Sequence, residues 1–233
     1  MTSDPPFLIE AFLTLLPGVP LTLLLGLVSF AFGAALAVPV ALLTMSSRGY
    51  LCWPARAYVV AFRGTPLLLQ LFLIYYGLPQ FDLIRHGSLW VIFRDPYFCA
   101  ILALTLNMAA YASEAVRGGL VAVPRGQVEA ALAGGMSPLM ALRRITLPLA
   151  LRQCLPALGS ELIIMLKSTS LASIIAVMEV TGLASRLIAE TYRVVEVLVA
   201  AGAIYLSLTF VSSRLVRWLE RRLTPYLLRE QVG

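Results

Sequence analysis

Apolar residues dominate five stretches of the chain, each close to the roughly 20 residues that a helix needs to cross a bilayer. Polar and charged residues gather in the connections between these stretches. The pattern therefore predicts an all-α membrane protein with five transmembrane helices, at residues 20–45, 57–78, 96–116, 153–177 and 194–218. Two longer connections contain short apolar pieces, at 88–93 and 184–192, which are re-entrant or lie at the membrane interface.

Composition strengthens the membrane assignment. The chain has 233 residues, of which 60% are hydrophobic and only 13% are charged. A soluble domain of this size cannot bury so much apolar surface, and the length suits a single domain spanning residues 1–233. The first ten residues contain Asp4 and Glu10 but no lysine or arginine, so a cleaved signal peptide is not expected.

The basic residues are distributed unevenly along the chain, and this distribution predicts the topology. Thirteen of the arginines lie in three regions, namely the connection after the first span with the start of the second, the segment between the third and fourth spans, and the C-terminal end from Arg214 onward, whereas the opposite connections hold four. Positive charge concentrates on the cytoplasmic side of membrane proteins, so the N-terminus is expected outside and the C-terminus inside. This role in topology accounts for the net charge of +6, and no nucleic-acid partner is predicted.

The predicted cytoplasmic segment at 124–148 contains the residues of a helix, a tight turn and a second helix. Residues 127–133 favour a helix, and Gly134 and Gly135 suit its C-terminus. Ser137 and Pro138 suit the N-cap and first position of a second helix, which should end before Pro148. One interpretation is a docking element for another protein, and the other is an amphipathic helix pair on the bilayer surface.

A spaced motif in this segment resembles a known family. Glu129, Ala130 and Ala131 are followed after three residues by Gly135, and after nine more by Ile145, Leu147 and Pro148. This matches the EAA-x3-G-x9-I-x-L-P signature of the membrane subunits of bacterial ABC importers. Residues 61–81, 94–120 and 166–184 narrow the resemblance to polar amino acid permeases, most closely those for histidine, lysine–arginine–ornithine and opines such as octopine and nopaline. It covers roughly residues 20–217.

The resemblance implies a fold, partners and a location. The implied fold has five spans, with the coupling helix between the third and fourth seated in an ATPase subunit. The implied partners are two ATPase subunits, a second homologous permease subunit or a copy of this chain, and a periplasmic binding protein, in the bacterial inner membrane. ATP and magnesium would belong to the ATPase, and this chain would bind no cofactor. Ser160 stands where the family often has asparagine.

Two ionisable residues lie inside the fourth predicted span. Glu161 and Lys167, the only lysine, are about 120° apart around an ideal helix and roughly 9 Å apart along it, so they do not form a natural pair. Glu161 shares a face with Ser168 and is a candidate to contact a cationic solute, or else a structural glutamate. Lys167 binds a solute carboxylate, pairs across a subunit interface or reaches the outer surface. The string 168–170 favours a local helix break.

Polar residues in the second and third spans are further pathway candidates. Asn107, Tyr111 and Glu114 can share one helix face and line a pathway, or they form interhelical hydrogen bonds. Glu114 and Arg117 are expected to form a local ion pair. Thr65 lies in a Gly-Thr-Pro sequence that should interrupt its helix, as a gate, a pocket wall or a plain kink.

Other function classes fit the sequence less well. Lys167-Ser168 lacks the glycines of a phosphate-binding loop, and no hydrolase or metalloprotease motif is present. The cysteines, Cys52, Cys99 and Cys154, and the lone His86 lack metal-ligand spacing, so neither a metal site nor a disulfide is predicted. The main alternative is an ion-coupled secondary amino acid carrier, which would leave the 124–148 motif without a role.

Overall fold

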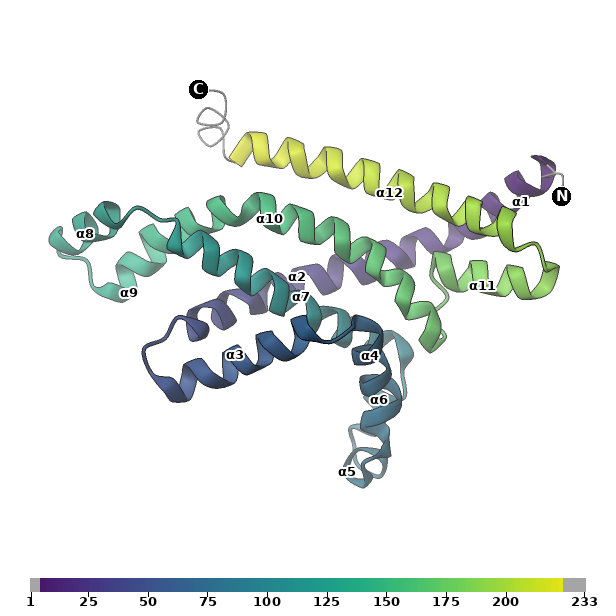
Figure 1. Cartoon of the computed structure of the whole chain (residues 1–233), viewed down its shortest axis with the longest axis horizontal. Coiled ribbons are helices and arrows are strands. Elements are labelled where there is room, and N and C mark those ends of the chain that lie inside the picture. Colours follow the sequence, from purple (N-terminus) through teal and green to yellow (C-terminus); the bar gives the residue numbers. More distant parts are fainter. Residues whose placement is uncertain (1–4, 224–233) are drawn as a thin grey trace.

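The computed structural model describes residues 5–223, and all regular structure in this range is helical. Four long helices form the body (Figure 1), namely α2 (Val19–Thr44), α7 (Pro96–Val121), α10 (Leu147–Ser168) and α12 (Val194–Leu223). The chain also contains α1 (Pro5–Leu15), η1 (Leu16–Gly18), α3 (Gly49–Gly64), α4 (Leu67–Phe72), η2 (Leu73–Gly77), η3 (Leu78–Gln80), α5 (Asp82–Arg85), α6 (Trp90–Phe93), α8 (Arg125–Ala133), α9 (Pro138–Ala141), η4 (Leu142–Thr146), η5 (Thr169–Ile175) and α11 (Val180–Thr191).

Small residues allow α2, α7 and α10 to pack closely. A Cβ atom on Gly33 of α2 would collide with Met108 of α7, and one on Gly119 of α7 would collide with the backbone of Ala150 in α10. Apolar side chains from the three helices, including Ala37 and Met108, form one buried cluster. Such small-residue contacts are typical of helix pairs in membranes, where close packing replaces the hydrophobic effect.

The five predicted spans are recovered in outline, with corrections at their ends. Within residues 5–223, four apolar helical stretches are long enough to cross a membrane, and a bent pair makes a fifth if it counts as one span. The first helical stretch starts near Phe7 rather than at residue 20, because α1 and η1 run into α2 with no extended residue between them. The third and fifth helices continue past their predicted ends at 116 and 218, to Val121 and Leu223.

The second predicted span is not one straight helix. The helical direction bends by 108° between Gly49–Gly64 and Leu67–Gln80, and Thr65 and Pro66 form the break. Thr65 and Pro66 have extended backbone angles, as expected where proline disfavours helix in the residue before it. The expected interruption at Gly-Thr-Pro is confirmed, and it takes the form of a sharp bend.

The second helix of the 124–148 segment does not end before Pro148, so that prediction is wrong. Residues Pro138–Ile175 form one helical stretch of 38 residues. A π-helical turn, η4, comes immediately before α10, and Pro148 sits in the first turn of α10. The π turn changes the hydrogen-bond pattern just before Pro148, so the proline is accommodated without ending the helical stretch.

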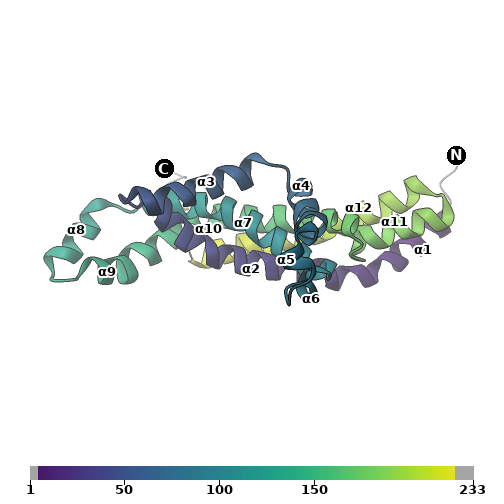
Figure 2. The ribbon, with the colours of Figure 1, turned by 90° about the horizontal axis from the view of Figure 1, so that it is seen from below.

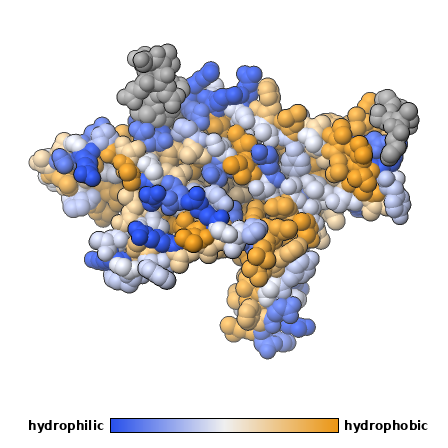
Figure 3. Space-filling view, in the orientation of Figure 1, coloured by the Kyte–Doolittle hydropathy of each residue, from blue (hydrophilic) through white to orange (hydrophobic). Residues whose placement is uncertain are grey.

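The molecule is elongated, and its two ends carry different elements (Figures 1 and 2). α8, α9, the turn between α2 and α3, and the C-terminal part of α12 lie at one end, whereas α1 and α11 lie at the other. α4, α5 and α6 form an arm that projects sideways from the body. Figure 3 shows hydrophobic side chains over the α1–α11 end and the upper part of this arm, and hydrophilic ones over much of the α8–α9 end.

Candidate functional site

A cavity of about 450 Å³ lies where the α3–α4 bend meets α7 and α10. Five of the six sequence-predicted pathway residues line it, although they come from three separate parts of the chain. The lining consists of Arg63, Gly64, Thr65, Pro66, Leu67, Asn107, Met108, Tyr111, Glu161, Ile164, Met165, Ser168 and Leu171. The cavity combines an apolar wall with a few polar groups, which is the usual composition of a small-molecule site.

The Gln70 side chain stabilises the bend between α3 and α4, and Gln70 was not among the residues predicted from the sequence. Its amide nitrogen donates to the carbonyls of Phe62 and Thr65, at 2.8 and 3.1 Å, and to the Thr65 hydroxyl at 2.9 Å. Asn107 in turn donates to the Gln70 side-chain oxygen at 3.0 Å. The helix break frees backbone carbonyls, and this side-chain network satisfies them. A glutamine four residues after an X-Pro break is the signal that could have identified it.

Glu161 and Arg63 are the charged groups of the cavity lining. The Glu161 side chain is partly buried and has no hydrogen bond or ion pair within residues 5–223. The Arg63 guanidinium lies 5.3 Å from the centre of the Tyr111 ring, and its positive charge acts on the Glu161 carboxylate. The Tyr111 hydroxyl donates to the Arg63 carbonyl at 3.5 Å. The lining therefore holds one negative and one positive group with unused hydrogen-bonding capacity.

The helix break expected at 168–170 is present at the end of α10. The helix changes there into the 3-10 segment η5, and serine and threonine hydroxyls bond to carbonyls of the preceding turn. Ser168 donates to the Ile164 carbonyl at 2.9 Å, and Thr169 donates to the Leu166 carbonyl at 2.8 Å. Lys167 is exposed and does not line the cavity, so the structure separates it from Glu161.

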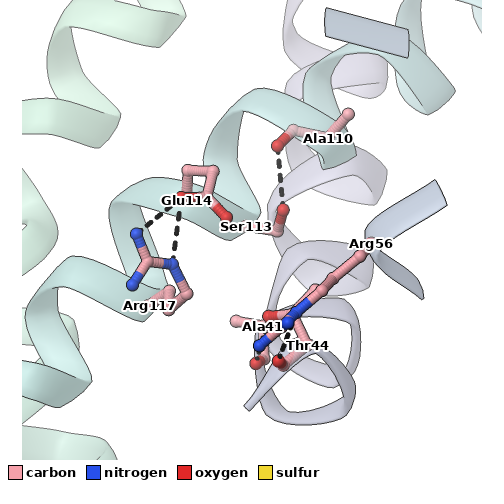
Figure 4. Close-up of polar contacts among 7 residues, drawn as sticks. All are labelled: Ala41, Thr44, Arg56, Ala110, Ser113, Glu114 and Arg117. Atoms are coloured by element: carbon pink, nitrogen blue, oxygen red, sulfur yellow. Dashed lines mark hydrogen bonds and ion pairs between the residues drawn. The ribbon is translucent and has the colours of Figure 1, made fainter. Parts of the chain in front are cut away.

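A second cavity, of about 380 Å³, shares Arg63 with the first and is lined by Thr44, Arg56, Val59, Val60, Arg63, Glu114 and Arg117. Asn107, Tyr111 and Glu114 therefore do not all line one cavity, because Glu114, less than one turn after Tyr111 in α7, lines the second cavity and not the first. The predicted Glu114–Arg117 ion pair is confirmed, with nitrogen–oxygen distances of 2.9 and 2.8 Å (Figure 4).

The 124–148 segment is a helix, a glycine turn and a second helix. Gly134 caps α8, and Gly135 has a φ of +83°, a conformation that a residue with a Cβ adopts only with strain. The Ser137 side chain accepts from the Met140 amide, as predicted for an N-cap. Of the motif residues, Glu129, Ala130, Gly135 and Pro148 are exposed, Ile145 and Leu147 are partly buried, and Ala131 is buried.

The same segment carries a shallow hollow of about 500 Å³, lined by Ser137, Leu139, Met140, Arg143 and Arg144. Leu139 is 74% exposed, and it lies at the start of the second helix of this segment.

A buried glutamate that the sequence analysis did not consider lies away from both cavities. Glu179 is fully buried and caps the N-terminus of α11, where it accepts from the Gly182 amide at 2.9 Å. The Tyr205 hydroxyl donates to it at 2.5 Å, and the Thr22 hydroxyl at 3.4 Å. An acidic residue just before a helix is an N-cap signal that could have marked it. Its partners from α2 and α12 are not evident from the sequence.

Neither cavity resembles a metal centre. Within residues 5–223, no group of three or more histidine, cysteine or acidic residues could hold a metal ion. The three cysteines are buried thiols without disulfide bonds, and His86 is an exposed residue 3.6 Å from Asp82.

Comparison with known proteins places these features in one family. The family model described as "Binding-protein-dependent transport system inner membrane component" matches residues 29–225. The chain is 52% identical to the octopine transport system permease protein OccM of Rhizobium meliloti, over 100% of this chain and 98% of that protein. It is also 52% identical to the nopaline transport system permease protein NocM of Agrobacterium fabrum, over 99% and 95%.

More distant relatives agree with these two. The arginine ABC transporter permease protein ArtM of Haemophilus influenzae is 37% identical, over 90% of this chain and 92% of that protein. Among solved structures, a chain from an amino acid ABC transporter crystallised with histidines superposes with a TM-score of 0.83. That chain is 35% identical, and the match covers 95% of this chain and all of that one.

Proposed function

The chain belongs to the family of inner membrane components of binding-protein-dependent transport systems, and from this we propose that its first cavity passes a cationic amino acid or an opine across the bilayer. The chain is a permease subunit of an ABC importer. The observation that carries the solute assignment is the Glu161 carboxylate, which faces the cavity and has no partner within residues 5–223.

The chemistry of the cavity suits a solute with separated charges. A carboxylate removed from water without a partner is costly, and a guanidinium or ammonium group of the solute would supply that partner. Arg63, on the same cavity, offers a fork of N–H donors to the solute carboxylate. Thr65, Asn107, Tyr111 and Ser168 would contribute the neutral hydrogen bonds that fix its orientation.

The orientation and the partners form the second part of the proposal. The arginine bias supports a cytoplasmic location for the α8–α9 end and the C-terminus, and an outer location for the N-terminus. The family implies an ATPase and a solute-binding protein as partners. We propose two ATPase copies, which alone bind ATP and magnesium, and a second permease subunit or a copy of this chain. The exposed Lys167 would face that neighbour.

Residues 124–148 would be the contact with the ATPase. In the proposed cycle, a loaded binding protein docks at the outer end and ATP closes the ATPase dimer. The motif residues Glu129, Ala130, Ala131, Gly135, Ile145, Leu147 and Pro148 form or support the surface that moves with the ATPase. The cavity then opens outward to receive the solute, and ATP hydrolysis returns it to the inward-open state.

Glu161→Gln in the reconstituted complex tests the solute assignment. The amide keeps the shape but loses the charge, so ATP-driven uptake of arginine or octopine should fall by about 10- to 100-fold, the usual cost of an unpaired charged group. Glu10→Gln is the matched control, because Glu10 is an exposed glutamate on α1 that does not line the cavity, and it should transport normally. Wild-type uptake by a fully assembled Glu161→Gln complex would contradict the assignment.

A glycine pair tests the coupling segment. Gly135→Ala places a Cβ on a backbone with φ of +83°, whereas Gly126 in α8 has open space around it and no positive φ. The strain of about 1 kcal/mol should lower ATP-driven uptake roughly fivefold in Gly135→Ala, and Gly126→Ala should have no effect. Equal uptake by the two variants would argue against an ATPase contact at this turn.

A further inference from the structure

The second cavity carries more positive than negative charge. Arg56 and Arg63 come from α3, and Arg117 comes from α7, whereas Glu114 is the only acidic residue in the lining. Arg56 and Arg63 are seven residues apart, about 10 Å along one face of α3. The net charge of the lining is therefore +2, next to a buried apolar wall that includes Val59.

The hydrogen bonds of these arginines within residues 5–223 leave several N–H donors unused, as Figure 4 shows for Arg56 and Arg117. Both hydrogen bonds of Arg117 go to one oxygen of Glu114 and engage its Nε and Nη2 atoms. Arg56 uses only Nε, which donates to the Thr44 carbonyl at 3.3 Å. The Arg63 guanidinium has a ring contact with Tyr111 but no hydrogen bond within residues 5–223. Guanidinium forks with free N–H groups are suited to bind carboxylate or phosphate oxygens.

The position of this cavity relative to the first one suggests its use. Arg63 lines both cavities. Along α7, Asn107 and Tyr111 line the first cavity, and Glu114 and Arg117 follow on the side that leads to α8. A solute leaving the first cavity toward the α8–α9 end would therefore meet Arg56 and Arg117 next.

We propose that Arg56, Arg63 and Arg117 form an oxyanion site that receives a carboxylate of the solute as it leaves the first cavity. The site rests on the proposed transport function and extends it. Arg63 would bind the carboxylate first, and Arg56 with the free nitrogen of Arg117 would bind it next. The same positive charge repels the cationic end of the solute, so the carboxylate leads and the cation stays near Glu161 until release.

The test uses the full complex in proteoliposomes, with arginine or octopine delivered by its binding protein. Arg56→Gln should lower the maximal uptake rate about tenfold, the usual effect of losing a charge-assisted hydrogen bond. It should raise the KM for loaded binding protein much less, and Arg56→Lys should recover part of the rate. Arg48→Gln is the matched control, since Arg48 is an exposed arginine just before α3 that does not line the cavity, and it should behave as wild type.

Three outcomes would overturn the proposal. These are wild-type uptake by Arg56→Gln, an equal loss in Arg48→Gln, and a difference between the variants that disappears in vesicles without anionic phospholipid. The last result would mean that a lipid phosphate, and not the solute, occupies the arginines.

A second measurement does not depend on transport. A sulfate titration should raise the Tm of the wild-type complex and of Arg48→Gln more than that of Arg56→Gln, because the anion binds the folded site. Equal shifts in all three proteins would contradict the oxyanion site. If the wild-type complex takes up neither solute but sulfate still raises its Tm more than that of Arg56→Gln, the proposed transport function is contradicted and the oxyanion site is supported.

Discussion

Two glutamates in this molecule are withdrawn from water in different ways. Glu179 is fully buried and accepts hydrogen bonds from Tyr205, Gly182 and Thr22, which tie together α2, α11 and α12. Glu161 is only partly buried, faces a cavity and has no such bonds within the described part of the chain. A carboxylate with all its partners stabilises the fold, whereas one without partners has capacity left for a ligand.

The largest effect is expected from removing the satisfied carboxylate. Glu179→Leu removes the acceptor of the Gly182 amide and one acceptor each of the Tyr205 and Thr22 hydroxyls, and it breaks the contact between α2, α11 and α12. The free energy of unfolding should fall by about 3 kcal/mol, which denaturant titration of the purified chain in detergent can measure. If Glu179→Leu lowers the free energy of unfolding no more than Glu10→Leu, a control at an exposed position, then Glu179 does not hold these helices together.

Gln70 tests whether the comparison also holds beside the cavity. Gln70 is 6% exposed and fully engaged with Phe62, Thr65 and Asn107, so it should act on stability as Glu179 does. Gln70→Leu should lower the free energy of unfolding by about 2 kcal/mol, because the carbonyls at the bend lose their donor. The exposed Gln80, in η3, supplies the control substitution Gln80→Leu. Similar unfolding curves for the two variants would contradict the bracing role of Gln70.

A smaller effect is expected from Tyr205→Phe. This change removes one hydroxyl that donates to Glu179 and lies 3.0 Å from the Thr181 hydroxyl. The loss should be about 1.5 kcal/mol, since Glu179 keeps its other two donors. Tyr192→Phe serves as the control, because Tyr192 is 87% exposed. An additive double variant with Glu179→Leu would show that the two side chains do not interact.

The smallest effect, and the one of opposite sign, is expected at Glu161. Glu161→Leu removes a partly buried carboxylate that makes no hydrogen bond within residues 5–223 and whose desolvation outweighs the attraction of Arg63, so the free energy of unfolding should rise by about 1 kcal/mol. ATP-driven uptake should be lost in the same variant. A thermal melt and an uptake assay on one preparation measure both. A drop in stability comparable to that of Glu179→Leu would remove the distinction between the two glutamates.

How well a feature could be predicted from the sequence depends on how far apart in the chain its interacting residues lie. Apolar length predicted the helices, and local turn chemistry predicted the Ser137 cap, the glycine turn at 134–135 and the Glu114–Arg117 pair. Helical periodicity also predicted that Glu161 and Ser168 lie on one face of their helix, and both line the first cavity. These features depend on residues at most seven positions apart.

Features that depend on distant contacts were not predicted. Glu179 is defined by a threonine 157 residues away and a tyrosine 26 residues away, which no local pattern indicates. The break at Gly-Thr-Pro was predicted, but the hydrogen bond between Gln70 and Asn107 that stabilises the 108° bend was not, because Asn107 lies in a different helix. Pro148 was wrongly assigned as a helix stop because a π turn can accommodate a proline that an α-helical count would exclude.

The helical stretch from Pro138 to Ile175 contains no intervening loop, although a π turn, Pro148 and Pro156 interrupt its α-helical hydrogen bonding before Glu161. Glu161 lies 23 residues after Pro138, about 35 Å along the helix axis. A flexible loop between these points would absorb a displacement, whereas a hydrogen-bonded helix is stiff in bending and twisting. The stretch therefore links α9 directly to the part of α10 that places Glu161 and Ser168 in the wall of the first cavity. A displacement of α9 would therefore reach the cavity wall through this one segment, and the π turn and the two prolines mark where the segment would bend.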